Sequence, residues 1–327
     1  QKADPTPRPQ ANEGFQASPG PLQLAHAIPC PGRFHAPKPI NIRGNPIMKL
    51  VRFGPTGKEK PGLIDADGKL RDLSKVVDDI NAETLSPKGL AAIRKRDPKR
   101  LPLVKGNPRF GPCVVERRVF AIALNYKEHA EEANAAIPSE PFVFTKTCPP
   151  TGHRDNIVLP KGSTKTDWEV ELCLVMGRKA KHVSKKDALK YVAGYFAGNE
   201  VSEREYLIER GGLQWIKGKS PDTFAPIGPW LLTADEVANP NNLHMWLEVN
   251  GVRKQDNNTR DMIYNCATII SNLSKTITLY PGDIIMTGTP QGVAYGQKNP
   301  KYLRAGDVVT LGIEGLGEQR NKVVKSK

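Results

Sequence analysis

The sequence has 327 residues, of which 38% are hydrophobic and 25% are charged, the proportions of an ordinary folded chain rather than a disordered one. Its formal net charge of +14 would suit a nucleic-acid-binding protein. The lysines and arginines are scattered, however, and are not interleaved with aromatic residues. We therefore expect the charge to attract small anionic substrates, and we expect no nucleic acid as a partner.

The sequence also lacks the features of membrane and secreted proteins. No run of about 18 apolar residues is present, and the first residues do not have the pattern of a secretory signal. The cysteines, which are Cys30, Cys113, Cys148, Cys173 and Cys266, form no CxxC pair and show no zinc-site spacing. Such cysteines are typical of reduced thiols, so the sequence predicts a cytoplasmic protein with no membrane partner.

The first elements in chain order indicate an arm followed by a small domain. Residues 1–47 are rich in proline, glycine and small polar residues and are expected to be disordered or loosely attached. Residues 48–112 are predicted to form a small β-rich N-terminal domain. Within it, Asp67-Gly68 favours a turn between two strands, and Ser86 followed by Pro87 favours the start of a helix that extends to Arg96.

Strands dominate the expected elements of the larger domain, residues 113–327. Asn250-Gly251 lies between two stretches of alternating apolar residues and predicts a hairpin. The other expected elements are a buried strand over 119–124, a loop and short helix over 125–135, a helix over 185–195 that runs into a strand, a helix over 267–274, and strands that follow the Gly-Asp turns at 282–283 and 306–307. Many strands, few helices and no regular βαβ alternation favour an α+β fold over a Rossmann fold.

Two glutamates in the segment TKTDWEVELCLVMG (164–177) are the first candidate site. Glu169 and Glu171 are two positions apart, so in a strand their side chains lie on the same face. The apolar run that follows them indicates a strand that is covered on both sides. The pair either lines a solvated sheet edge or holds a positive group. Because carboxylates are hard oxygen ligands, the second alternative points to Mg²⁺, Mn²⁺ or Ca²⁺.

Other segments supply residues that would complete such a site. Glu200 follows an apolar strand and offers a third carboxylate. Lys146 and Lys219 could balance charge or bind an anionic substrate. His129 and Glu132 are three residues apart on a helical stretch, so they share a face and could act as a general-base pair. Together these residues predict a metal site with a base and cations around it.

Six motifs carry a resemblance to a known family. In chain order they are NYKEHAEE, TDWEVELCLVMG, AGYFAGNEVSERE, KGKSPDTFAPIGPWL, VNGVRKQDNNTRDMI and PGDIIMTGTPQGV. Together they resemble the fumarylacetoacetate hydrolase family from about Met48 to the C-terminus, most closely its bacterial 2,4-diketo-3-deoxy-fuconate hydrolase and ureidoglycolate lyase-like members. The resemblance implies a mixed β-roll with a small N-terminal domain and a homodimeric assembly.

The resemblance also implies roles for individual residues. Glu169, Glu171 and Glu200 match the three metal-binding carboxylates. The remaining matches are His129 and Glu132, which would activate water on a lid segment, Lys146 and Lys219 near the reacting carbonyl, and Arg204, Thr289 and Tyr126, which would contact the substrate.

Two positions depart from the family pattern. Glu200 stands where an aspartate is usual, and its additional methylene would move the carboxylate by roughly 1.5 Å. A larger ion such as Mn²⁺ or Ca²⁺ would accommodate this shift better than Mg²⁺. Leu207 stands where a glutamine is frequent, which would remove a polar contact from the pocket.

The resemblance implies a hydrolase that acts on a carbon–carbon bond of a 2,4-diketo acid, either an acylpyruvate or a diketo-deoxy sugar acid. The metal would stabilise the enolate that leaves, and His129 would deprotonate the attacking water. Oxaloacetate decarboxylation, keto–enol tautomerisation and 2-keto-enoate hydration use the same enolate and stay open. A degenerate member that binds a 2-keto acid without converting it is the alternative from a different class.

Overall fold

A computed structural model of the chain describes residues 48–210 and 212–327, which all belong to one unit of the fold. The arm predicted over residues 1–47, together with Cys30, lies outside the described residues. Within them, no helix is long and apolar enough to cross a membrane. Cys113, Cys148, Cys173 and Cys266 are free and buried.

Strands outnumber helices in the described ranges. The helices are α1 Pro87–Arg94, α2 Lys127–Glu132, α3 Trp215–Lys219 and α4 Cys266–Thr276, with a 3-10 turn at Ala188–Tyr191 and a π-type turn at Glu205–Glu209. The strands are β1 Lys49–Phe53, β2 Lys60–Ile64, β3 Leu70–Asp72, β4 Arg118–Ala123, β5 Phe142–Lys146, β6 Thr151–Gly152, β7 Ile157–Leu159, β8 Thr166–Asp167, β9 Val170–Met176, β10 Val192–Asn199, β11 Ser202–Glu203, β12 Pro226–Ile227, β13 Leu231–Thr233, β14 His244–Val249, β15 Val252–Asn258, β16 Asp283–Met286, β17 Val308–Ile313 and β18 Gly317–Lys325.

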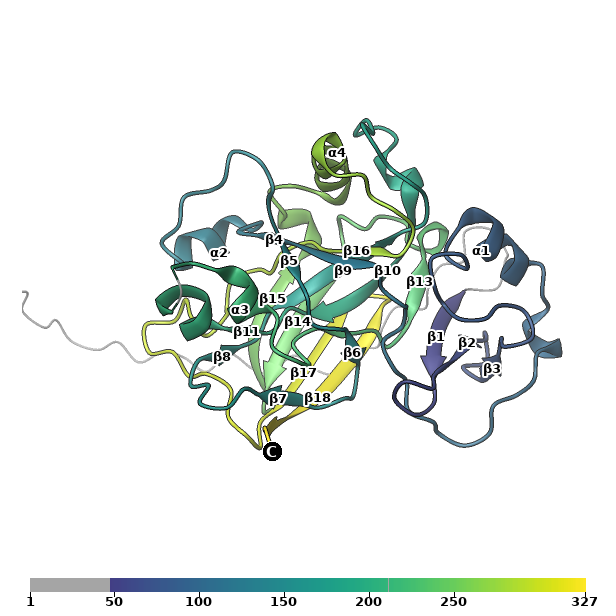
Figure 1. The fold of residues 1–327 in the computed structure, drawn as a ribbon, viewed down its shortest axis with the longest axis horizontal. Helices are drawn as coiled ribbons and strands as arrows, with labels where there is room; N and C mark the ends of the chain where they lie inside the picture. The colour runs from purple at the N-terminus through teal and green to yellow at the C-terminus, as the bar shows by residue number, and fades with distance from the viewer. Residues whose placement is uncertain (1–47, 211) are drawn as a thin grey trace, which may run out of the picture. The chain divides into compact units, whose positions relative to one another are not determined.

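Two large sheets form the framework of these residues (Figure 1). The first has the strand order β3-β2-β1-β13-β10-β9-β16-β4-β5, and the second has the order β15-β14-β17-β18-β7. Most neighbouring strands are antiparallel, whereas β16 and β4 are parallel. β1 pairs with β13, so the strands of residues 48–112 extend the first sheet. The mixed sheets and short helices confirm the predicted α+β, mixed β-roll fold.

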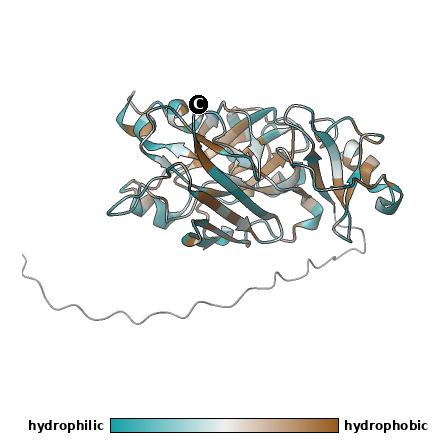
Figure 2. Cartoon of the chain, turned by 90° about the horizontal axis from the view of Figure 1, so that it is seen from below, coloured by the Kyte–Doolittle hydropathy of each residue, from teal (hydrophilic) through white to brown (hydrophobic). Residues whose placement is uncertain are grey.

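Strand β9 separates two hydrophobic cores. Val170, Leu172 and Leu174 pack in the larger core, and Cys173 and Val175 pack in the smaller one. Because side chains alternate along a strand, β9 presents one face to each core, which explains why its sequence is almost continuously apolar. Figure 2 shows such apolar stretches, in brown, along the strands, and hydrophilic colour along many connecting segments.

Several local predictions are confirmed by the hydrogen bonds of the structure. Ser86 caps α1, and its hydroxyl accepts a hydrogen bond from the backbone N–H of Gly89 at 3.2 Å. Strands β14 and β15 form the predicted hairpin. Asn250 and Gly251 at its turn both have positive φ, as a tight turn between two twisted strands requires.

One local prediction is wrong in length. The helix expected over residues 185–195 is only a 3-10 turn, Ala188–Tyr191, before β10 begins at Val192. The reason is that the apolar residues from Val192 onward pair with β9 along its whole length. Burial in the centre of a sheet outweighs the modest helical preference of the preceding lysines.

Protonation of His153 is expected to destabilise the fold in acid. Burial, with the charges of Arg154 and Arg109, lowers the pKa of His153 to about 4, and the ring packs against Phe110. Between about pH 6.5 and pH 4 the unfolded chain therefore binds more protons, so the free energy of unfolding falls as the pH falls, by up to about 3 kcal/mol. Urea unfolding at pH 7 and pH 5 measures this change.

The His153→Asn variant is the control for that measurement. Its free energy of unfolding is expected to change less over the same pH interval, because asparagine does not titrate. Equal pH dependence of the two proteins would assign the acid sensitivity to other groups.

Candidate active site and metal centre

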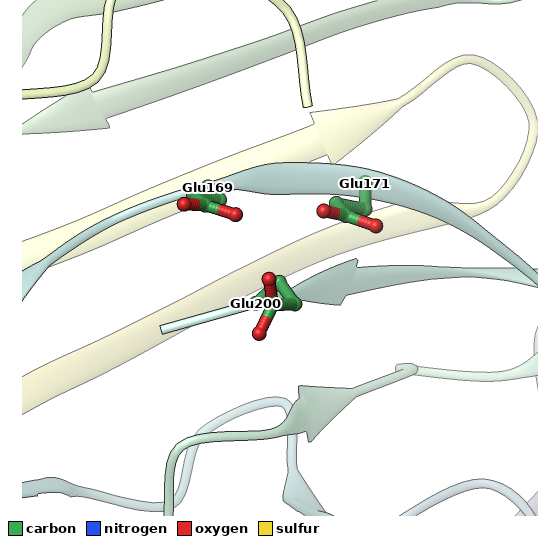
Figure 3. A group of neighbouring side chains, drawn as sticks. All are labelled: Glu169, Glu171 and Glu200. Carbon is green, nitrogen blue, oxygen red and sulfur yellow. The ribbon is translucent and has the colours of Figure 1, made fainter. Parts of the chain in front are cut away.

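Strands β9 and β10 bring three glutamates together (Figure 3). Glu171 lies in β9 and Glu169 directly precedes it, while Glu200 follows the last residue of β10. The backbone N–H of Glu200 donates to the carbonyl of Glu169 at 2.8 Å, which sets the two residues opposite each other. Each glutamate offers a carboxylate oxygen within 4.8 Å of the other two, and all three are at most 3% exposed. The pair in β9 therefore lines a buried site.

Gly198 gives the cluster its room. It lies opposite Glu171 in the register of β9 and β10. A Cβ atom at this position would overlap Cys173 Sγ and lie 3.0 Å from Met286 Cε. Glycine at this position therefore leaves room for the side chains of Cys173 and Met286 beside the cluster.

The Gly198→Ala variant is expected to lose about 1–3 kcal/mol of stability because the added methyl group overpacks this contact. The midpoint of urea unfolding measures the loss. Adding Cys173→Ala removes the overlapping sulfur, so the double variant should recover part of the loss. A single variant as stable as the parent would show that the strands separate at no cost.

Two lysines supply positive charge to Glu169 and Glu200. Lys219, the last residue of α3, donates to both carboxylate oxygens of Glu169 at 3.1 Å and also to Glu200. Lys146, the last residue of β5, donates to Glu200 at 2.6 Å and to the carbonyl of Val201 at 3.2 Å. Burial lowers the pKa of Lys219, but Glu169 and Glu200 outweigh that effect and raise it, so Lys219 is a cation in the site.

Arg204 contacts carboxylates within the site. Its guanidinium donates to Glu169 at 2.5 Å and to Asp167 at 2.9 Å. Asp167 is fully buried and also accepts from the backbone N–H groups of Trp168, Ala294 and Tyr295. Asp167 is not among the site residues predicted from the sequence. Its position two residues before Glu169 in the same alternating pattern is a signal that would have identified it.

Glu171 differs from the other two glutamates in its partners. Its carboxylate accepts a hydrogen bond from the backbone N–H of Gly288 at 2.8 Å. Burial and the charges of Glu200 and Glu169 raise the pKa of Glu171 well above its usual value. Glu169 shows the opposite behaviour, because Lys219 and Arg204 outweigh its burial and hold its pKa well below its usual value. The cluster is thus electrostatically unbalanced at Glu171.

The predicted general-base pair is formed. His129 Nδ1 and Glu132 Oε1 are 2.9 Å apart on α2. The carboxylate of Glu132 also accepts from the backbone N–H of Gly292, at 3.0 Å from Oε2. These bonds fix the histidine ring and join α2 to the loop that follows β16. His129 is 8% exposed, and among the described contacts it bonds to Glu132 and to none of the three glutamates.

Two predicted substrate-binding residues are buried with internal partners, and so is the departing residue Leu207, by packing alone. Thr289 donates to the carbonyl of Val170 and accepts from Gln255 Nε2 at 2.8 Å. Tyr126 is fully buried, and its hydroxyl donates to Met245 Sδ at 3.3 Å. The third is Leu207, which packs beneath α3. The structure therefore places Thr289 beside β9 and Tyr126 in the larger core.

Leu207 supports the element that carries Lys219. A Cβ atom on Gly218 would lie 2.6 Å from Leu207 Cβ, so the backbone of α3 rests directly on this side chain. Leu207 is 3% exposed. Leu207 therefore makes no polar pocket contact. It packs against Gly218, the residue that precedes Lys219.

Known proteins are similar to this chain over most of the described residues. Residues 118–324 match the family model described as the fumarylacetoacetate (FAA) hydrolase C-terminal domain. A protein of Burkholderia multivorans, whose name describes it as a supposed hydrolase, is 57% identical over 275 residues, which cover 83% of this chain and 97% of that protein. The chain belongs to the fumarylacetoacetate hydrolase family.

Solved structures similar to this fumarylacetoacetate hydrolase family member carry the names of different activities. The fumarylacetoacetate hydrolase of Exiguobacterium antarcticum is 30% identical with a TM-score of 0.73, and covers 85% of this chain and 100% of its own. A maleylpyruvate hydrolase from Sphingobium sp. SYK-6 is 27% identical with a TM-score of 0.69, at 85% and 100% coverage. A 2-hydroxyhepta-2,4-diene-1,7-dioate isomerase from Mycobacterium marinum is 28% identical with a TM-score of 0.65, at 85% and 99% coverage.

The residues of this family member fit a divalent cation. The donors are carboxylate oxygens, which are the ligands that Mg²⁺, Mn²⁺ and Ca²⁺ prefer. The repulsion that raises the pKa of Glu171 would become an attraction if a cation lay among the three carboxylates. If all four buried carboxyl groups of the site were ionised, they would outnumber its three cations: Asp167, Glu169, Glu171 and Glu200 against Lys146, Arg204 and Lys219.

Proposed function

We propose that this chain is a metal-dependent hydrolase that cleaves a carbon–carbon bond of a 2,4-diketo acid. The observation that carries the proposal is the buried cluster of Glu169, Glu171 and Glu200. A cluster of this composition can hold a divalent cation, and the two lysines beside it can stabilise negative charge that forms on the reacting carbonyl of a small keto acid. The names of the hydrolases among the similar structures agree with this reaction class.

The hydrogen-bonded pair on α2 supplies the general base that hydrolysis requires. Glu132 bonds to Nδ1 of His129 and so favours the tautomer whose Nε2 is free to accept a proton. Hydrolysis needs such a base, because the attacking water must lose a proton as it adds to the carbonyl at C4. Isomerisation of a keto acid moves a proton without adding water.

The chain's residues can then perform each remaining part of the reaction. Water adds to C4, the C3–C4 bond breaks, and its electron pair passes to the keto acid fragment as an enolate, which takes up a proton at C3. Lys146 and Lys219 place two ammonium groups at the cluster, where they can stabilise the oxyanion formed at C4. A divalent cation held by the three glutamates would supply Lewis-acid stabilisation of the enolate. The products are a carboxylic acid and a 2-keto acid.

Loss of the enol absorbance of acylpyruvates tests the proposal. The assay uses acetylpyruvate and larger acylpyruvates with Mg²⁺ or Mn²⁺, and it is repeated with a chelator. We expect chelator-sensitive loss with one carboxylic acid and one pyruvate formed per substrate consumed. No loss from folded protein would contradict hydrolysis. Loss of the enol without formation of a carboxylic acid would assign the tautomerase alternative.

Several broader assignments accompany this proposal. We assign residues 48–112 to a small N-terminal domain and residues 113–327 to the catalytic domain. We also propose a homodimer, on the family resemblance, and a cytoplasmic location, which the free buried cysteines support. Sedimentation equilibrium of the purified chain tests the dimer.

A further inference from the structure

An exposed aromatic surface extends outward from the lysines of the site. We define this surface, the aromatic shelf, as Phe142, Phe144, Trp215 and Ile216. The rings of Phe142 and Phe144 each lie 5.1 Å from the ring of Trp215, centroid to centroid, at tilted and edge-on angles. Phe142 is 46% exposed and Ile216 is 51% exposed. Large apolar side chains gathered at a surface in this way usually mark a place where something binds.

The shelf is continuous with the carboxylate cluster. Phe142 begins β5 and Lys146 ends it, while Trp215 begins α3 and Lys219 ends it. The Lys219 ammonium lies 5.2 Å from the centroid of the Phe144 ring. The same two elements therefore carry a cation at the buried end and aromatic rings at the exposed end.

This polarity fits a ligand with one anionic end and one apolar end. A 2,4-diketo acid places its carboxylate and its acyl substituent at opposite ends of a short chain. With the keto acid end at the carboxylate cluster and C4 at the lysines, the acyl substituent points along the shelf. A hydroxylated sugar chain would bury less apolar area on these rings than an aryl group of similar length. An aryl group would instead pack against the rings in the tilted arrangements that aromatic pairs prefer.

We propose that the aromatic shelf binds the acyl substituent of the substrate, and that this substituent is an aryl or similarly flat apolar group. The inference rests on the proposed function for the position of the keto acid end. It narrows the substrate class from 2,4-diketo acids in general to acylpyruvates with an apolar acyl group, and it disfavours diketo-deoxy sugar acids.

The first test compares benzoylpyruvate with acetylpyruvate as substrates of the full chain. We expect kcat/KM to be higher for benzoylpyruvate. In the variants Trp215→Ala and Phe142→Ser, the ratio of the two kcat/KM values should fall about tenfold, the loss expected for one buried aromatic contact. Phe142 lies on β5, so its substitution tests the shelf without changing a residue of α3. Val252→Ala, an equally exposed apolar position on the β14–β15 hairpin, should leave the ratio unchanged.

The second test measures binding and does not depend on turnover. Calorimetry compares phenylpyruvate with pyruvate on the Mn²⁺-loaded protein. We expect phenylpyruvate to bind more tightly, and Trp215→Ala to reduce that difference about tenfold. This preference without any acylpyruvate hydrolysis would contradict the proposed function and leave the shelf assignment standing.

Three outcomes would overturn the shelf assignment. Equal binding of the two keto acids, or binding of neither, is the first. A substrate ratio unaffected by both variants is the second. The third is a change in the sedimentation mass of the variants while the ratio of the two kcat/KM values stays unchanged. This result would show that a second copy of the chain occupies the shelf.

Discussion

The Glu171→Gln variant should lose divalent-metal binding and about a thousandfold or more of acylpyruvate turnover, yet be more stable than the parent when both are metal-free. Lewis-acid stabilisation is worth several kcal/mol, and each ~1.4 kcal/mol changes a rate tenfold. The gain in stability has a separate cause. Burial and two neighbouring carboxylates disfavour the charge on Glu171, and glutamine removes that charge while its amide oxygen can still accept from Gly288.

Calorimetry with Mn²⁺ measures the loss of binding, and urea unfolding in chelator measures the gain in stability. Asp283→Asn is the matched control, because Asp283 is also fully buried in the first sheet but is paired with Arg118. It should destabilise the fold and leave metal binding unchanged. A Glu171→Gln protein that binds Mn²⁺ like the parent would remove this residue from the metal site.

The substitutions at Glu171 and Asp283 are expected to change stability in opposite directions because the two carboxylates have different partners. The sequence does not display these partners. The spacing of Glu169 and Glu171 is enough to predict a shared face, because strand alternation is a local rule. Whether each carboxylate meets a cation depends on α3 and the segment at Arg204, which are distant in sequence. The sequence predicts a positive group between Glu169 and Glu171, whereas in the structure Lys219 bridges Glu169 and Glu200.

Glu200 shows a similar limit. From the sequence, its additional methylene was expected to displace the carboxylate from the metal position. In the structure Glu200 stays within the cluster, and its two carboxylate oxygens contact Lys146 and Lys219 separately. The longer side chain thus connects both lysines. Leu207 likewise looked like a lost polar contact, whereas its packing against Gly218 supports α3. A comparison with the family pattern identifies the positions that differ, but the packing around each residue determines its structural effect.

The fold could be predicted where local residues determine the structure. The prediction failed where burial against a distant segment determines it. A capping serine and an Asn-Gly turn specify their own geometry, so α1 and the β14–β15 hairpin were predicted from a few residues each. The segment before β10 was expected to be a longer helix. There, pairing with β9 determines the outcome, and that partner lies in a separate part of the sequence.

The His129→Ala variant should lower kcat for acylpyruvates by about 10²–10⁴-fold, the usual contribution of a general base, while metal binding stays intact. His129 bonds to Glu132 and to none of the three glutamates among the described contacts. Glu132→Gln should lose less activity, because it weakens the orientation of the ring without removing the base. It should also alter the pH profile of kcat, which a purely structural role would not do.

Steady-state kinetics at saturating Mn²⁺, together with calorimetry of metal binding, measures both effects. His244→Ala is the control, because His244 Nε2 lies 2.7 Å from Asp256 Oδ1 in a pair of the same type on the exposed hairpin. It should change neither quantity. If His129→Ala keeps full turnover, water activation on α2 is wrong and the hydrolase would need another base. If it loses metal binding as well, the histidine supports the cluster instead of acting on water.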